Sequence, residues 1–168
     1  VLVHIGGIIT PAVEELKALC DSKGIALIED CAHAHGCSYK GVAAGAWGLA
    51  GAFSYFPTKP LVCGEGGCIT TKDAALAEKA FMLRNHGKNP KLGNRISELG
   101  HNWRMSELTA LVAVQQTRKA KVLFADRKAT AAYYDRELKD LMGAKPLPMP
   151  EGLDTTFYKY VLWLDPKV

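Results

Sequence analysis

The sequence predicts a layered α/β fold in which helices flank a mostly parallel sheet. Residues 2–5 and residues 25–30 are apolar segments, and a helical segment that starts at Thr10 and Pro11 lies between them. A strand, a helix and a strand in this order form the βαβ unit, which joins parallel strands. Residues 106–142 contain neither Gly nor Pro, so one long helix or two abutting helices are expected there.

The first helix and the second strand have local signals of their own. Thr10 is expected to be the N-cap and Pro11 the first helical residue, and Gly24 is expected to stop the helix. Residues 25–30 are a continuous apolar run that ends in two carboxylates, which is typical of a buried parallel strand.

Two further strands and a helix are expected in the middle of the chain. Residues 52–56 predict a third strand, and residues 68–71 predict a fourth that runs antiparallel after a short glycine turn. Residues 73–83 begin with an acid and predict a helix, and residues 85–100 predict a polar loop. The apolar side chains of the long helix should cover the sheet or a partner subunit. They are Leu108, Leu111, Val112, Val114 and residues 122–124.

The prolines at positions 146, 148 and 150 indicate a linker. After them, residues 155–164 alternate aromatic and polar side chains, as a half-buried strand of a second domain does. We therefore expect a partial large domain over residues 1–142, followed by a linker and the first strand of a small domain over residues 143–168.

Composition excludes several classes of function. The net charge of +4 is mild and the basic residues are spread along helices, which does not predict a nucleic-acid surface. No apolar run approaches the ~20 residues that span a bilayer. The five cysteines form an odd, scattered set, which indicates a reducing compartment and not a disulfide framework. A cytoplasmic enzyme is expected.

Lys59 is the first candidate for chemistry. It follows an apolar strand, with Ser54 five positions earlier and glycines at 64, 66 and 67 just after. A lysine amine becomes a nucleophile toward an aldehyde when apolar neighbours partly remove it from water. Glycines let the backbone approach a ligand closely. Taken alone, a lysine in this setting is more often an ordinary surface residue.

A second candidate site follows the strand at residues 25–30. Asp30 is followed by Cys31, His33 and His35, and open α/β sheets bind ligands at the carboxyl ends of their strands. Two alternatives remain open. Asp30 has the residue type of a helix N-cap or turn acid. The two histidines, with Cys31 and Cys37 nearby, are conceivable zinc ligands, although no Cys-x-x-Cys pair supports them.

Four motifs occur in a fixed order along the chain. They are Glu-Asp-Cys-Ala-His-Ala-His-Gly at 29–36, Phe-Ser-x-x-x-x-Lys at 53–59, Gly-Glu-Gly-Gly at 64–67, and Gly-His-Asn-Trp-Arg-Met-Ser-Glu at 100–107. In this combination the sequence resembles the pyridoxal-phosphate-dependent sugar aminotransferases of the DegT/DnrJ/EryC1/StrS group. The resemblance covers most of the chain and is weakest between residues 119 and 154. It implies part of the large cofactor-binding domain of fold type I, the aspartate-aminotransferase-like fold.

The resemblance implies a role for each candidate residue. Lys59 would form the internal aldimine with pyridoxal 5'-phosphate and later move the proton between substrate and cofactor. Asp30 would pair with the pyridine nitrogen, where a carboxylate favours the protonated ring that best accepts electrons. His33 would touch the ring hydroxyl or face, and Ser54 the phosphate. Asn102 would reach the partner's cofactor phosphate across a homodimer interface.

By the same resemblance, the reaction is transfer of an amino group from glutamate to a keto group on a nucleotide-linked sugar, as in polysaccharide biosynthesis. One alternative is a pyridoxal-phosphate-dependent sugar dehydratase, but in that related branch a histidine replaces the lysine found here at Lys59. The other is a catalytically silent fragment or assembly segment. Members of the group are roughly twice as long as these 168 residues, so an interior segment is expected.

Overall fold

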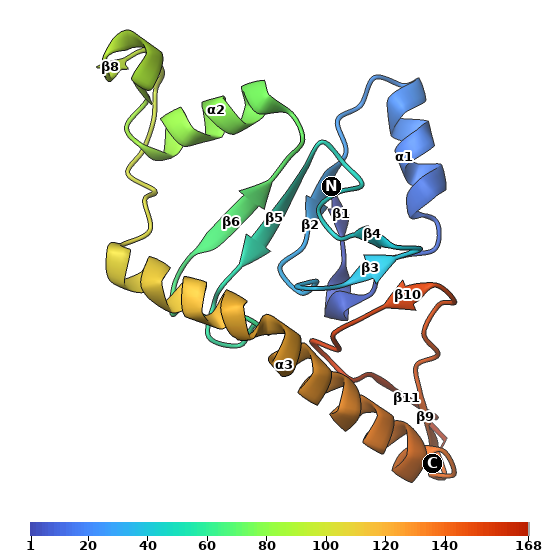
Figure 1. The fold of residues 1–168 in the computed structure, drawn as a ribbon. Helices are drawn as coiled ribbons and strands as arrows, with labels where there is room; N and C mark the ends of the chain where they lie inside the picture. The colour runs from blue at the N-terminus through green and yellow to red at the C-terminus, as the bar shows by residue number, and fades with distance from the viewer. Residues whose placement is uncertain (168) are drawn as a thin grey trace.

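The computed structural model describes residues 1–167, and its centre is a four-stranded sheet (Figure 1). The strands lie in the order β1 (Leu2–Val3), β2 (Ile28–Asp30), β5 (Ala50–Ser54) and β6 (Gly67–Thr70). β1, β2 and β5 are parallel, and β6 is antiparallel to β5. The expected α/β class, the mostly parallel sheet and the antiparallel fourth strand are confirmed.

The first strand is shorter than expected because the chain turns at two glycines. Gly6 and Gly7 have φ values of 68° and 89°, and they lie in a 3₁₀ turn, η1 (Ile5–Gly7). Backbone with positive φ leaves the extended region that a strand requires, and glycine adopts it without steric cost.

The first helix, α1 (Val13–Ser22), connects β1 and β2 as expected, but its predicted start is wrong. Ala12 occupies the N-cap position, and the Thr10 hydroxyl accepts the Ala12 N–H at 3.3 Å in a turn that precedes the helix. The predicted stop is confirmed, because Gly24 lies just after the helix with a φ of 63°.

The other two helices begin at side-chain caps. α2 (Ala74–Arg84) is capped by Asp73, whose carboxylate accepts the N–H groups of residues 75 and 76. α3 (Glu107–Leu138) is capped by Ser106, whose hydroxyl accepts the N–H of Thr109 at 3.2 Å. The stretch without Gly or Pro is therefore a single helix of 32 residues.

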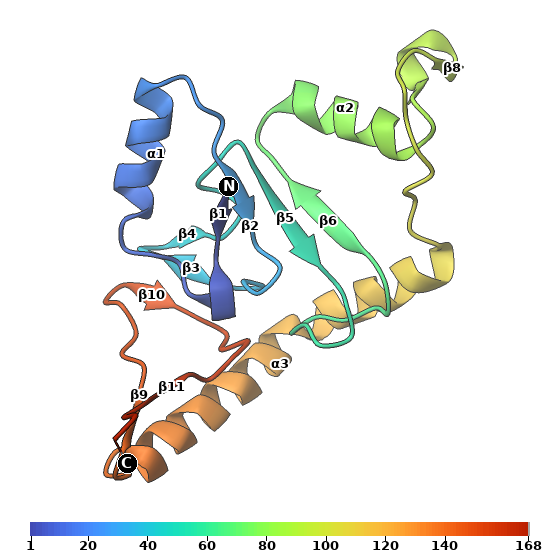
Figure 2. The same cartoon turned by 180° about the vertical axis from the view of Figure 1, so that it is seen from behind.

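Several short strands were not expected. A hairpin of β3 (Ser38–Tyr39) and β4 (Val42–Ala43) pairs with β10 (Leu153–Asp154), and β9 (Ala144–Pro146) pairs with β11 (Leu162–Leu164). The polar loop contains β7 (Lys88–Asn89), a 3₁₀ turn η2 (Pro90–Leu92) and β8 (Arg95–Ile96). Figure 2 shows β9 and β11 beside the C-terminal end of α3, and β10 next to β3.

The single strand expected over residues 155–164 is wrong. Phe157 has a φ of 49°, a left-handed conformation that interrupts an extended chain, and regular strand geometry returns only at β11. Thr155 and Thr156 are buried. The domain division at residue 142 stays a prediction.

The hydrophobic core lies between α1, the sheet and the β3–β4 hairpin. Its buried members are Ile9, Val13, Cys31, Ala34, Cys37, Tyr39 and Ala44. α3 packs on the turn after β2 at Gly36, where a Cβ atom would lie 2.3 Å from a ring carbon of Phe124. Much of the apolar face of α3 is exposed in the described residues, since Leu108 is 80% and Val122 is 64% accessible.

Among the described residues, no helix is both long enough and apolar enough to cross a membrane.

Candidate functional site

Two neighbouring parallel strands bring Asp30 and Ser54 to the same edge of the sheet. Asp30 is the last residue of β2 and is in register with Ala52 of β5, and Ser54 is the last residue of β5. Lys59 follows on a turn in which its N–H donates to the carbonyl of Phe56 at 2.9 Å. The carboxyl ends of adjacent parallel strands thus carry an acid and a hydroxyl at one edge of the sheet, and the amine follows on the next turn, the edge at which open α/β sheets bind ligands.

His33 lies on the turn that leaves β2. Its Nδ1 accepts the backbone N–H of Gly6 at 3.2 Å, and its ring stacks on Tyr158 with ring centroids 4.1 Å apart. Gly7 makes this approach possible, because a Cβ there would lie 2.9 Å from the carbonyl oxygen of His33. The turn η1 after β1 therefore holds the imidazole from one side, and Tyr158 covers it from another.

Tyr158 also contacts the lysine. The Nζ of Lys59 lies 4.9 Å from the centroid of the Tyr158 ring, and the Tyr158 hydroxyl lies 3.2 Å from Oγ1 of Thr58. A second ammonium group, that of Lys159, lies at the same distance from this ring. The pKa of Tyr158 is lowered, first by the hydrogen bond with Thr58 and then by the two lysine charges, against the effect of burial.

Sequence patterns did not indicate Tyr158. Its aromatic type in the alternating stretch was the only signal, and its partner Thr58 is 100 residues away in the chain.

The surroundings of His33 favour its neutral form. Burial lowers the pKa of His33 most, the positive charges of Lys59 and Lys159 lower it further, and the Asp30 carboxylate opposes them. The geometry agrees for the lysine, because the Tyr158 ring that stacks on His33 is also the ring that Nζ of Lys59 approaches.

Asp30 has one oxygen in a local turn and one available for a ligand. Oδ1 accepts the N–H of Ala32 at 3.0 Å, so the turn-acid interpretation is also satisfied. Within residues 1–167, Oδ2 of Asp30 accepts no hydrogen bond. Ser54 similarly accepts the N–H of Phe56 at 3.3 Å, which leaves its own hydroxyl proton for another acceptor.

Asn102 is not brought to this group. It lies in an exposed segment that pairs with Asn85 at the end of α2, and its Oδ1 accepts from Nε of Arg104 at 3.0 Å. Its expected role concerns a partner subunit and stays a prediction.

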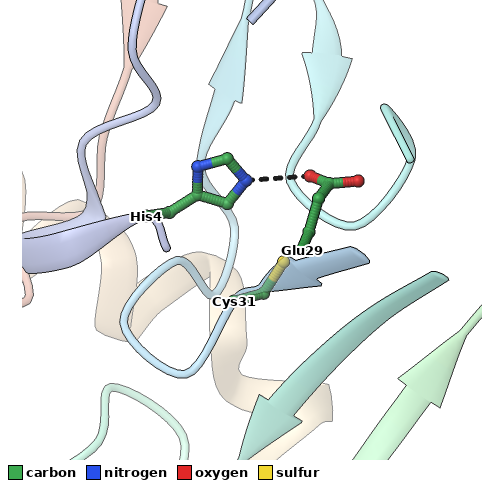
Figure 3. Close-up of side chains that lie close together, drawn as sticks. All are labelled: His4, Glu29 and Cys31. Atoms are coloured by element: carbon green, nitrogen blue, oxygen red, sulfur yellow. Dashed lines mark hydrogen bonds and ion pairs between the residues drawn. The ribbon is translucent and has the colours of Figure 1, made fainter. Parts of the chain in front are cut away.

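Glu29, next to Asp30, is a buried carboxylate that the sequence did not distinguish (Figure 3). Its Oε2 accepts from Nε2 of His4 and from the N–H of Gly45, both at 2.8 Å. Its Oε1 accepts the N–H groups of Trp47 and Gly48, also at 2.8 Å. Successive side chains of a strand point to opposite faces of the sheet. Glu29 therefore binds the loop at residues 45–48 on the face away from Asp30.

His4, Glu29 and Cys31 are the metal-ligating side chains that lie close together within residues 1–167, in place of the histidine and cysteine set considered for zinc. The four hydrogen bonds already occupy both carboxylate oxygens of Glu29. Burial and the nearby charges of Glu29 and Asp30 raise the pKa of the Cys31 thiol to about 12, so it stays protonated, whereas metals bind thiolates. We interpret the cluster as structural.

Glu29 is expected to be essential for stability. Burial alone would raise its pKa, but hydrogen bonds from His4, Gly48 and Gly45 outweigh that effect and lower it. Glu29→Gln would place an amide NH₂ against backbone donors, so we expect a loss of about 3 kcal/mol in unfolding free energy, measured by denaturant titration. Glu14→Gln, at an exposed ion pair with Lys40, is the control and should change stability by less than about 1 kcal/mol. Equal effects of the two substitutions would contradict the structural interpretation.

His35 is expected to make stability depend on pH. It is buried beside Phe53 and Tyr55, and burial, followed by the Lys59 charge, lowers its pKa from 6.5 to about 4. The unfolded chain therefore binds a proton at higher pH than the folded chain does. Stability should fall by about 3 kcal/mol as the pH drops from 6.5 to 4. His35→Gln, which does not titrate, should lack this component in denaturant titrations at the two pH values.

A large apolar groove, of about 1170 Å³, lies away from this group between β5, β6, α2 and the start of α3. None of the five predicted site residues lines it.

Comparison with known proteins gives a consistent result. The model of the DegT/DnrJ/EryC1/StrS aminotransferase family matches residues 1–168. The L-glutamine:2-deoxy-scyllo-inosose aminotransferase of Streptomyces paromomycinus is 37% identical over 171 residues, which cover 95% of this chain and 40% of that protein. The UDP-4-amino-4,6-dideoxy-N-acetyl-beta-L-altrosamine transaminase of Helicobacter pylori is 34% identical over 76% of this chain and 35% of its own length.

Solved structures agree in fold. Helicobacter pylori PseC, an aminotransferase involved in the biosynthesis of pseudoaminic acid, matches 98% of this chain and 45% of its own with a TM-score of 0.90 and 30% identity. DesV of S. venezuelae, solved with a ketimine intermediate, has a TM-score of 0.89 and 32% identity over 98% of this chain and 44% of its own. The chain thus spans less than half the length of these relatives.

Proposed function

Because this chain belongs to the DegT/DnrJ/EryC1/StrS aminotransferase family, we propose that the whole protein transfers an amino group to a keto group of a sugar. The family is one of pyridoxal-phosphate-dependent aminotransferases. The observation that carries the proposal is the meeting of Asp30, His33, Ser54 and Lys59 at the carboxyl edge of β2 and β5.

We further propose glutamate as the amino donor and a nucleotide-linked keto sugar as the acceptor. The first is the donor implied by the family resemblance. The second is supported by relatives such as the dTDP-3-amino-3,4,6-trideoxy-alpha-D-glucose transaminase of Micromonospora megalomicea, which is 35% identical over 88% of this chain.

The residues present suit pyridoxal 5'-phosphate. When bound, this cofactor supplies an aldehyde for a lysine amine and a pyridine ring that accepts electrons from the substrate. Oδ2 of Asp30, which accepts no hydrogen bond within residues 1–167, matches a pyridine N–H. The hydroxyl of Ser54 has a proton to donate to a phosphate oxygen, as has the neutral imidazole of His33 to a ring hydroxyl.

In this proposal the side chains have different tasks. Lys59 would hold the cofactor through its aldehyde and, once the incoming amino group has displaced its amine, would carry a proton to and from the substrate carbon. Asp30, as a carboxylate, holds a proton on the ring nitrogen. His33 and Ser54 orient the ring and its phosphate. Asn102 is proposed to complete the phosphate contacts of a partner subunit in a homodimer.

The first test is spectroscopic. The protein is mixed with pyridoxal 5'-phosphate, the visible absorption band of a Schiff base is recorded, and borohydride reduction is followed by peptide mapping. Label on Lys59 alone is the expected result, both for the whole protein and for any part of it that builds the pocket. Absence of a band in the whole protein, or label scattered over many lysines, would overturn the proposed function.

A further inference from the structure

A short segment after β10 lies against the site and donates hydrogen bonds to three backbone carbonyls of other segments. The hydroxyl of Thr155 donates to the carbonyl of Gly7 at 2.9 Å, and that of Thr156 donates to the carbonyl of His35 at 2.8 Å. The N–H of Lys159 donates to the carbonyl of Gly6 at 3.4 Å. We call residues 155–159 the strap. It joins the turn after β1 to the turn after β2, the two turns that hold His33.

α3 determines the backbone shape of the strap through one arginine. Nε of Arg127 donates to the carbonyl of Thr156 at 3.1 Å, and its Nη2 donates to those of Phe157 and Tyr158 at 2.6 and 3.0 Å. Three successive carbonyls face one guanidinium, which stabilises the left-handed conformation at Phe157. This bend places the Tyr158 ring on His33 instead of leaving it on a continuing strand.

We propose that Tyr158 is a positioning residue of this site, which packs on His33 and, together with the Gly6 N–H, presents Nε2 of His33 as a hydrogen-bond donor. Nδ1 of His33 accepts the Gly6 N–H, so in a neutral imidazole the proton is on Nε2. The stacked Tyr158 ring limits the access of water to the imidazole, and this loss of hydration disfavours the charged imidazolium form. The groups that face His33 are Asp30, Lys59, Lys159 and Tyr158, with His35 following on the same turn.

The positioning role of Tyr158 depends on the proposed function in one respect only: the group that accepts the hydrogen bond from Nε2 of His33 would be the ring hydroxyl of the cofactor. Its main test therefore uses the whole protein without cofactor. Ring-labelled histidine is titrated by NMR, and the His33 signal is assigned by its loss in His33→Gln. Ring nitrogen shifts report the tautomer, and the pH dependence of the signal reports the pKa.

The expected results distinguish the effect of the Tyr158 ring on the pKa of His33 from the effect of the Tyr158 hydroxyl. In the wild-type protein His33 carries its proton on Nε2 and its pKa lies below 6.5. Tyr158→Ala exposes the imidazole and raises the pKa of His33. Tyr158→Phe keeps the stack, loses only the hydrogen bond with Thr58, and leaves this pKa as in the wild type. His35, packed on Phe53 and Tyr55, is the internal control and does not shift in either variant.

Two results would overturn the proposal. One is a proton on Nδ1 of His33 in the wild-type protein, a result that needs no variant to fold. The other is a His33 pKa in Tyr158→Ala that equals the wild-type value, or that moves only together with the pKa of His35.

A second measurement links the positioning role to the ligand. Loss of one well-oriented hydrogen bond should weaken binding of pyridoxal 5'-phosphate by about tenfold in Tyr158→Ala, and Tyr158→Phe should bind as the wild type does. Wild-type protein that shows the expected NMR behaviour but no cofactor binding would refute the proposed function and leave the positioning of His33 intact. Equal cofactor affinity of Tyr158→Ala and the wild type would refute the link between Tyr158 and the cofactor.

Discussion

Lys59→Ala in the whole protein is expected to abolish both covalent attachment of pyridoxal 5'-phosphate and turnover. In the proposed function the Lys59 amine is the group that bonds to the aldehyde, and a positioned proton carrier alone contributes about 10²–10⁴-fold in rate. The measurement is single-turnover amino transfer, with mass mapping after borohydride reduction. We expect a rate loss of at least about a thousandfold.

The structure provides a closely matched control for this substitution. Lys159 places its Nζ at 4.9 Å from the same Tyr158 ring, at the same distance as Lys59. Lys159→Ala should keep the label and most of the activity. Label that remains in Lys59→Ala and disappears in Lys159→Ala would reverse the assignment of the two lysines, and retained turnover in Lys59→Ala would refute the role of Lys59.

Asp30→Asn is expected to leave the cofactor partly bound and to slow proton abstraction from the substrate severely. An amide does not hold a proton on the ring nitrogen as a carboxylate does, so electrons from the substrate carbon are accepted less readily. Removing one preorganised electrostatic interaction of this kind costs on the order of 10²–10³-fold in rate. The loss should appear in the rate of loss of deuterium from the labelled amino donor, measured under single-turnover conditions.

The neighbouring carboxylate is the control for Asp30. The amide oxygen in Asp30→Asn still accepts the N–H of Ala32, so its unfolding free energy should stay within about 1 kcal/mol of the wild-type value. Glu29→Gln should show the larger loss of stability instead. Undiminished proton abstraction in Asp30→Asn would mean that Asp30 has only the local turn role that its Oδ1 already performs.

Local patterns predicted the three α-helices and the four strands of the central sheet because their causes are local. The acidic cap at Asp73, the cap at Ser106 and the stop at Gly24 each depend on residues within one helical turn. The start of α1 was predicted two residues early because Thr10 forms a turn before the helix and not its cap. The strand expected over residues 155–164 failed because Arg127 on α3 and the buried threonines hold those residues in another shape.

The sequence by itself determined the family, the α/β class and the identities of the candidate site residues, because short motifs and periodic patterning are visible within a few neighbouring residues. Only the tertiary structure assigned different tasks to the adjacent carboxylates Glu29 and Asp30 and placed Tyr158 against His33 and Lys59. Those arrangements depend on packing between segments such as Thr58 and Tyr158, 100 residues apart. The local conformational preferences of one segment do not determine which distant segment packs against it.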